Sequence, residues 1–191
     1  EVLAQVCDGL GFAHRNGIVH RDIKPANVRV LRDGKRLQAK VMDFGVARVS
    51  NSDMTATGMV MGTVSYMAPE YIQTGKPDPR SDLFAVGVML YESLSGRKPF
   101  AGDTTPTILY RIVNDAPEPL DPAELRGVSP AIHSVLDRAL QKDPALRHQT
   151  AEELAKALRA AKDPTWHGEL PEATARLAPA APTVAVQAAP A

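Results

Sequence analysis

The chain has 191 residues, of which 44% are hydrophobic and 23% are charged, an ordinary composition for a globular protein. Its 22 basic and 22 acidic residues balance, which argues against a general binder of nucleic acid or of membrane surfaces. The single cysteine, Cys7, excludes an internal disulfide and fits a reducing compartment. Because no apolar run is long enough for a membrane span, we expect none in this chain and a cytoplasmic location.

The first part of the chain combines a helix with a hairpin. Apolar residues at helical spacing predict a helix over residues 2–16. Two short β-like runs follow, residues 28–31 and 39–42, and the Asp33-Gly34 pair between them favours a hairpin turn. Residues 43–71 have an irregular pattern that is too long for a simple connection, so we expect a functional or mobile loop there.

The second part of the chain is predicted to be helical. Ser81 is expected to cap a helix over residues 82–94 that is apolar nearly all round and therefore buried as the axis of the domain. Thr150 is expected to cap the last helix, with Glu153 as its capping-box partner. Further helices are predicted over residues 105–113, 130–141 and 151–161. The fold class expected is mainly α with one small β-hairpin, followed by a disordered Ala- and Pro-rich tail or linker at 163–191.

Two short motifs carry the chemistry. The stronger is the loop His20-Arg21-Asp22-Ile23-Lys24-Pro25-Ala26-Asn27, which places an ammonium group and a carboxamide shortly after a carboxylate. Phosphoryl transfer needs a carboxylate that orients the attacking hydroxyl and accepts its proton, a cation for the phosphate oxygens and an oxygen ligand for magnesium. The second motif is Asp43-Phe44-Gly45, in which a carboxylate follows the second β-like run, as suits a hard cation.

With these motifs the sequence resembles the C-terminal lobe of a eukaryotic-type protein serine/threonine kinase of the bacterial kind. The eight-residue loop matches the family's catalytic loop, and Asp43-Phe44-Gly45 matches its metal-binding turn. Met67-Ala68-Pro69-Glu70 matches the end of its activation segment, and Arg147 the arginine that pairs with that glutamate. The resemblance implies a protein kinase-like fold, C-terminal large lobe only, with a partial kinase domain at 1–162.

The resemblance implies a role for each residue of the site. Asp22 would be the catalytic base, or the residue that orients the substrate hydroxyl, and Lys24 would contact the γ-phosphate of ATP. Asn27 and Asp43 would hold the Mg²⁺ ions that bridge the phosphates. Thr63 would hydrogen-bond Asp22 and Lys24 and shape the site for a Ser or Thr acceptor. ATP and Mg²⁺ are thus the implied cofactors, and a protein with a Ser or Thr acceptor is the implied substrate.

The resemblance also implies supporting residues. His20 and Phe44 would stack in a hydrophobic spine, and Gly45 would complete the metal-binding turn. Asp82, at the start of the central buried helix, would accept hydrogen bonds from the backbone near His20 and Arg21.

Regulation by phosphate is implied as well. Arg21 precedes the catalytic aspartate, as in kinases whose activation loop is switched by phosphate, which an arginine can clamp. The implied acceptors are Thr55 and Thr57, in a run similar to the double-threonine loop of bacterial transmembrane kinases. Another kinase molecule is the implied partner for that phosphorylation. The tail resembles the linker of bacterial receptor-like kinases, so a longer parent would be membrane-anchored.

Two departures from the family leave alternatives open. The sequence begins just before the helix of the catalytic loop and has no counterpart of the N-terminal lobe, so we expect these residues alone to transfer phosphate poorly. Arg29 stands where the family usually has an aliphatic residue, and it would either stack on the adenine ring or spoil an apolar floor. A catalytically inactive lobe that binds partner proteins is the alternative. A small-molecule phosphotransferase is a third possibility. The segment from Met67 to Glu70 and Thr63 argue against it, because enzymes of that kind generally lack both features.

Overall fold

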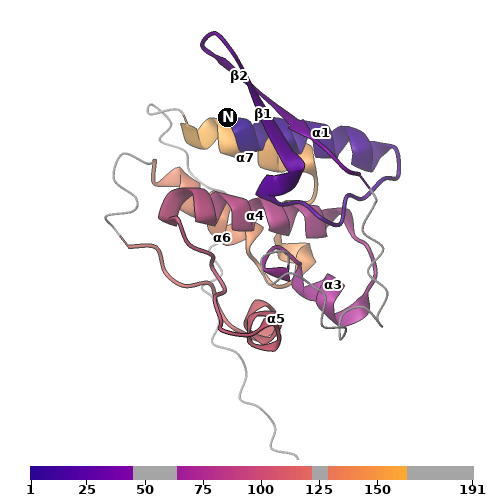
Figure 1. The fold of residues 1–191 in the computed structure, drawn as a ribbon, viewed down its shortest axis with the longest axis vertical. Coiled ribbons are helices and arrows are strands. Elements are labelled where there is room, and N and C mark those ends of the chain that lie inside the picture. The colour runs from indigo at the N-terminus through magenta and orange to yellow at the C-terminus, as the bar shows by residue number, and fades with distance from the viewer. Residues whose placement is uncertain (45–63, 122–128, 163–191) are drawn as a thin grey trace, which may run out of the picture.

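The computed structural model describes residues 1–44, 64–121 and 129–162. Within these ranges the fold is mainly α-helical with one two-stranded antiparallel sheet, as predicted (Figure 1). The helices are α1 (Val2–Arg15), α3 (Pro69–Thr74), α4 (Pro79–Ser95), α5 (Thr105–Asn114), α6 (Ala131–Ala139) and α7 (Ala151–Lys162). The strands are β1 (Val28–Asp33) and β2 (Arg36–Val41), and the 3-10 turns are η1 (Pro25–Asn27) and η2 (Pro144–Leu146). None of the helices in the described ranges combines the length and apolar character needed to cross a membrane. The tail predicted at 163–191 lies outside the described residues.

Helix α4 is the axis of the fold, and its residues are buried continuously over 81–91, as its apolar composition predicts. Its start differs from the prediction, because Asp78 rather than Ser81 is the cap. The Asp78 carboxylate accepts a hydrogen bond from the Arg80 amide at 2.8 Å. Pro79 takes the first helical position, where no amide hydrogen is needed, so the helix starts earlier than the Ser81 signal suggested.

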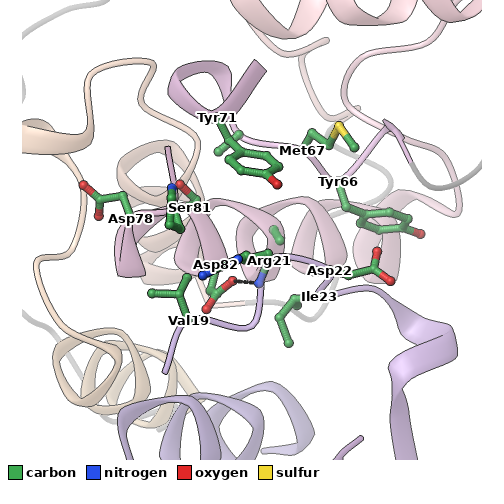
Figure 2. Close-up of a pocket in the computed structure, with 13 residues that line it drawn as sticks. Val19, Arg21, Asp22, Ile23, Tyr66, Met67, Tyr71, Asp78, Ser81 and Asp82 are labelled. Carbon is green, nitrogen blue, oxygen red and sulfur yellow. Dashed lines mark hydrogen bonds between the residues drawn. The ribbon is translucent and has the colours of Figure 1, made fainter. Parts of the chain in front are cut away.

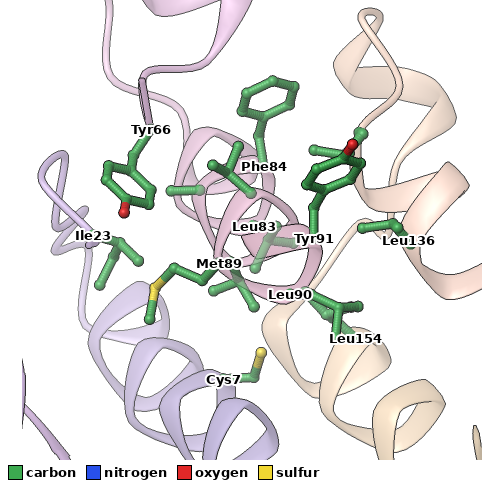
Figure 3. Packing of buried hydrophobic residues seen from close by; sticks show 14 of the residues in the cluster. Cys7, Ile23, Tyr66, Leu83, Phe84, Met89, Leu90, Tyr91, Leu136 and Leu154 are labelled. Carbon is green, nitrogen blue, oxygen red and sulfur yellow. The ribbon is translucent and has the colours of Figure 1, made fainter. Parts of the chain in front are cut away.

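Helices α1, α6 and α7 pack around α4, and α1 and α7 lie side by side (Figures 1 and 3). Cys7 of α1, Leu136 of α6 and Leu154 of α7 belong to one apolar cluster with α4. Burial raises the pKa of the Cys7 thiol to about 12, so this cysteine is an unreactive core residue. Helix α6 approaches α4 closely at Gly87, where an added Cβ would lie 2.9 Å from the Ala139 Cβ.

The hairpin formed by β1 and β2 stands on α1 (Figure 1). Its register pairs Val28 with Val41 at the base and Asp33 with Arg36 at the turn, so both strands reach closer to the turn than predicted. A two-residue connection joins them, and its first residue, Gly34, has a φ of 57°. Glycine adopts this left-handed conformation without a Cβ clash, which explains the position of the turn.

Helix boundaries elsewhere agree with the prediction to within two residues at each end, except for α3. Helix α3 lies in the stretch predicted to be irregular. It runs from Pro69 to a left-handed Gly75 with a φ of 65°, and its six residues are too few for a helical pattern to show in the sequence. Helix α7 is capped as predicted, because Thr150 Oγ1 accepts from the Glu153 amide at 3.1 Å. The Glu153 carboxylate, however, accepts from the Gln149 amide, one residue earlier than a capping box requires.

Of the side chains in the described ranges, Arg147 is the largest that is fully buried, with 0% of its surface exposed. Its guanidinium donates to both oxygens of the Glu70 carboxylate, at 2.8 and 2.7 Å. Its remaining N–H groups donate to three backbone carbonyls, those of Arg80, Gln141 and Lys142. Ser81, which does not cap α4, donates its hydroxyl to the same carboxylate at 2.6 Å. The network therefore ties α3 to α4 and to the segment that precedes α7.

We expect Arg147→Lys to lower the free energy of unfolding by about 3 kcal/mol, because the three donors of an ammonium group cannot serve the buried carboxylate and the three carbonyls together. Urea unfolding followed by circular dichroism measures the change. Arg159→Lys is the matched control, since Arg159 pairs with Asp8 at the surface, where an ion pair contributes about 1 kcal/mol or less. Equal losses in the two variants would contradict a stabilising role for the buried network.

His148, the residue after Arg147, is also buried, with 2% of its surface exposed. Its Nδ1 has no hydrogen-bond partner among the described residues. Burial, together with the nearby Arg138, lowers the pKa of His148 to about 4, although Glu153 opposes the shift. The imidazole is therefore neutral in the folded chain at neutral pH.

The pKa of His148 in the folded state lies below its value in the unfolded chain, so the stability that the neutral ring contributes is present above about pH 6.5 and is lost as the pH falls towards 4. At pH 5 the expected loss is ~2 kcal/mol. We expect His148→Asn, which does not titrate, to lack this loss. Urea unfolding of both chains at pH 7 and pH 5 provides the test. The same pH dependence in both would contradict a neutral buried His148.

Candidate active site

The loop over residues 20–27 connects α1 to β1 and is fixed to α4 by one buried carboxylate. Asp82, in the first turn of α4, is 1% exposed. It accepts hydrogen bonds from the amide of His20 at 2.9 Å and from the amide of Arg21 at 2.8 Å. Figure 2 shows the bond to Arg21. His14 Nε2 donates a third bond at 2.8 Å, which the sequence did not suggest because the two residues are 68 positions apart. The three donors compensate the burial of the carboxylate and hold the loop on the core helix.

Asp22, Lys24 and Asn27 come together on this loop. Asp22 Oδ2 lies 2.8 Å from Lys24 Nζ and 3.0 Å from Asn27 Nδ2. Asn27 Nδ2 also donates to the Asp22 backbone carbonyl at 2.7 Å, an arrangement set by the short turn η1. Because both hydrogens of the amide group point to Asp22, the end of Asn27 that is open to a cation is its Oδ1.

Asp43 lies beside Asn27 at the base of the hairpin. Met42, the residue before it, donates its amide to the Asn27 carbonyl at 2.9 Å and so extends the strand pairing by one step. Within the described residues, no hydrogen bond or ion pair engages the exposed Asp43 carboxylate. Carboxylate and amide oxygens are the ligands that Mg²⁺ prefers, so Asn27 and Asp43 fit a magnesium ion by the chemistry of their donors.

Two residues with a Cβ have left-handed backbones in the described chain, and both lie in this site. Arg21 has a φ of 71° and Asp43 a φ of 60°. Such conformations are strained and concentrate at functional sites, where the surroundings hold them in place. His20 links the two, because its Nε2 bonds to the Met42 carbonyl at 2.8 Å and its ring lies 4.8 Å from that of Phe44.

A pocket lies beneath the loop, between residues 19–23, the segment before α3 and the first turns of α4 (Figure 2). Arg21 lines it, and the buried Arg21 Nε has no hydrogen-bond partner within the part of the chain that is described. An arginine with an unused donor suits an anion such as phosphate. Tyr66 also lines the pocket, and its hydroxyl donates to Glu92 at 2.5 Å. Burial and this carboxylate raise the pKa of Tyr66 above its ordinary value.

The remaining predicted residues fall into three groups. Glu70 and Arg147 form the buried pair described above. Arg29 is exposed on β1, directly opposite Lys40. Four predicted site residues lie outside the described residues: Gly45, Thr55, Thr57 and Thr63. Sequence reasoning missed His14 and Tyr66, because the motifs carry no sign of their distant partners Asp82 and Glu92.

Comparison with known sequences places the site in context. Residues 1–158 match the family model of the protein kinase domain. The serine/threonine-protein kinase PknB of Mycobacterium tuberculosis is 41% identical over 176 residues, which cover 91% of this chain and 27% of that protein. PknB of Mycolicibacterium smegmatis is 38% identical over 195 residues, covering 100% of this chain and 30% of that protein. The serine/threonine-protein kinase drp72 of Corynebacterium efficiens is 39% identical over 180 residues, covering 92% and 33%. The chain thus spans 27–33% of the length of these curated relatives.

We expect Asp82→Asn to release the loop from α4, because an amide NH₂ group would face a backbone N–H that now donates to a carboxylate oxygen. The free energy of unfolding should fall by about 3 kcal/mol. Amide hydrogen exchange at His20 and Arg21, followed by NMR, should accelerate. Asp78→Asn is the control, since asparagine caps a helix about as well as aspartate. An Asp82→Asn variant no weaker than this control would rule out the anchor.

Proposed function

This chain belongs to the protein kinase domain family, and from that membership and the loop geometry we propose that it is the C-terminal catalytic lobe of an ATP- and Mg²⁺-dependent protein serine/threonine kinase. One observation carries the proposal. The Asp22 carboxylate lies within 3.0 Å of both the Lys24 ammonium and the Asn27 amide. The loop that bears all three is fixed to the buried core helix by Asp82.

The geometry suggests how the residues divide the reaction. Asp22 orients the Ser or Thr hydroxyl and accepts its proton as the oxygen forms a bond to the γ-phosphorus and the bond to the β-phosphate oxygen breaks. Lys24, beside the same carboxylate, places a positive charge next to the phosphoryl oxygens. Asn27 Oδ1 and the Asp43 carboxylate would hold Mg²⁺, which neutralises phosphate charge when bound. Thr63 completes the acceptor side of the site in this proposal.

The proposal also includes an N-terminal lobe and protein substrates. An N-terminal lobe would complete the nucleotide site, and the kinase domain would occupy residues 1–162, with 163–191 as a linker. The substrates would be proteins with Ser or Thr acceptors. We place the lobe in the cytoplasm, with a longer parent anchored in the membrane.

We also propose that phosphate activates the protein through Arg21. The buried Nε of Arg21 has no hydrogen-bond partner among the described residues. Arg21 lies in the same loop as the proposed base, and its amide donates to Asp82 of α4. Phosphate on Thr55 or Thr57, added by another kinase molecule, would supply the missing acceptor and favour one arrangement of the loop.

The test measures transfer of radiolabelled phosphate from ATP to casein by the native protein that contains this chain. We expect Mg²⁺-dependent labelling of Ser and Thr, reduced about 100-fold or more by Asp22→Asn, since that is the usual contribution of a general base. Asp43→Asn should raise the Mg²⁺ requirement. Asp33→Asn, at the exposed hairpin turn, is the matched control.

Two results would go against the proposal. Labelling that survives Asp22→Asn would exclude Asp22 as the base. A folded native protein without any turnover would favour the alternative, a catalytically inactive lobe that binds partner proteins.

A further inference from the structure

The outer edge of β2 is where a third strand would pair. In a hairpin with a two-residue turn, the pair next to the turn exchanges backbone hydrogen bonds, and bonded and non-bonded pairs then alternate. Counting from the Asp33–Arg36 pair, Leu37 and Ala39 are at non-bonded positions. Their carbonyl and amide groups therefore point away from β1 and present an acceptor and a donor at the edge.

Gln5 of α1 satisfies both groups with one side chain. Gln5 Nε2 donates to the Leu37 carbonyl at 3.0 Å, and Gln5 Oε1 accepts from the Ala39 amide at 2.8 Å. A carboxamide carries the same donor and acceptor as a backbone peptide group. The side chain thus takes the place of one residue of a third strand and fastens the hairpin to a helix.

The face of α1 that carries Gln5 packs against β2. Gly9 lies one helical turn after Gln5 and so on the same face of the helix. A Cβ placed at Gly9 would already be in contact with Val41, at 3.6 Å from its Cγ2 atom. This is an ordinary van der Waals distance, so α1 and β2 pack against each other beside Gln5.

Among the described residues, the packing of the hairpin against the core is only partial. Val28, Ala39 and Val41 pack partly buried against the core. Val30, which faces Ala39 across the sheet, and Leu37, which is nearer the turn, are 47% and 45% exposed. A two-stranded hairpin is marginally stable by itself, so its tilt depends on what fastens it to the rest of the fold.

The base of this hairpin carries the two candidate magnesium ligands. Asn27 directly precedes β1, and Asp43 comes two residues after the end of β2, with Met42 bonded to the Asn27 carbonyl between them. A rotation of the hairpin on α1 would therefore move Asp43 relative to Asn27, whose amide is held by two hydrogen bonds to Asp22.

We propose that Gln5 is a positioning residue for the magnesium site, because its carboxamide fixes the hairpin on α1 and thereby the placement of Asp43 relative to Asn27. The inference rests on the proposed kinase function, and it adds a residue that touches neither the nucleotide nor the metal ion. Gln5 acts through the two hydrogen bonds to β2.

The test uses the native protein with Gln5→Met, which keeps the length of the side chain and removes both hydrogen bonds. Gln38→Met is the matched control, because Gln38 is exposed on the same strand. We expect faster hydrogen exchange at the Ala39 amide and a half-saturating Mg²⁺ concentration raised about 10-fold, the usual scale for loss of a residue that orients a metal ligand. The kcat at saturating Mg²⁺ should stay within about 2-fold of the wild type, and Gln38→Met should leave both quantities unchanged.

Each outcome of these two measurements either supports or overturns the role of Gln5. Unchanged exchange at Ala39 would mean that the bonds to Gln5 do not hold the strand, and faster exchange with an unchanged Mg²⁺ requirement would reduce Gln5 to a structural role. Either result overturns the inference and leaves the proposed function standing. A wild-type protein without Mg²⁺-dependent turnover would overturn both. If Gln5→Met fails to fold, Gln5→Ala serves instead, since alanine removes both hydrogen bonds and is a good helix former.

Discussion

The buried carboxylate of Asp82 is the constraint on which the arrangement of this site depends. An ionised carboxylate offers only acceptors, and at 1% exposure it must find donors inside the protein. The chain supplies two backbone amides of the loop and one imidazole nitrogen from the end of α1. The end of α1 and the loop that follows it are therefore fixed to one point of α4, 61 to 68 residues further along the chain. The strained backbone of Arg21 persists because Asp82 holds its amide.

The rest of the site depends on connections to rigid helices in the same way. The hairpin that carries Asn27 and Asp43 is held by Gln5 of α1, and α1 packs on α7 and α4. The segment that ends at Glu70 is held by Arg147, whose guanidinium lies 4.9 Å over the Phe84 ring of α4. Each functional segment is irregular or short, and each is joined to a helix by a polar side chain with satisfied donors and acceptors.

Much of this organisation was predictable from the sequence, because it depends on patterns of residues that are close together in the chain. The apolar run of α4 indicated a buried axis, and the spacing of Asp22, Lys24 and Asn27 within eight residues indicated a phosphoryl-transfer loop. The hairpin followed from the Asp33-Gly34 pair, although the strands extend closer to the turn than their β-like runs. Local chemistry also misled, since Ser81 looks like a cap but bonds to Glu70, and Pro79 moves the helix start upstream.

The unpredicted contacts share a physical cause, which is the distance along the chain between their partners. Gln5 and the strand edge are 32 and 34 residues apart, and His14 and Asp82 are 68 apart. A glutamine on a helix face has no local property that marks it as the substitute for a strand residue. Its role exists only once the turn at Gly34 has set which backbone groups of β2 face outward. The motif of a site can thus be read from a few adjacent residues, whereas the residues that hold it in place are determined by the pairing register and by helix packing.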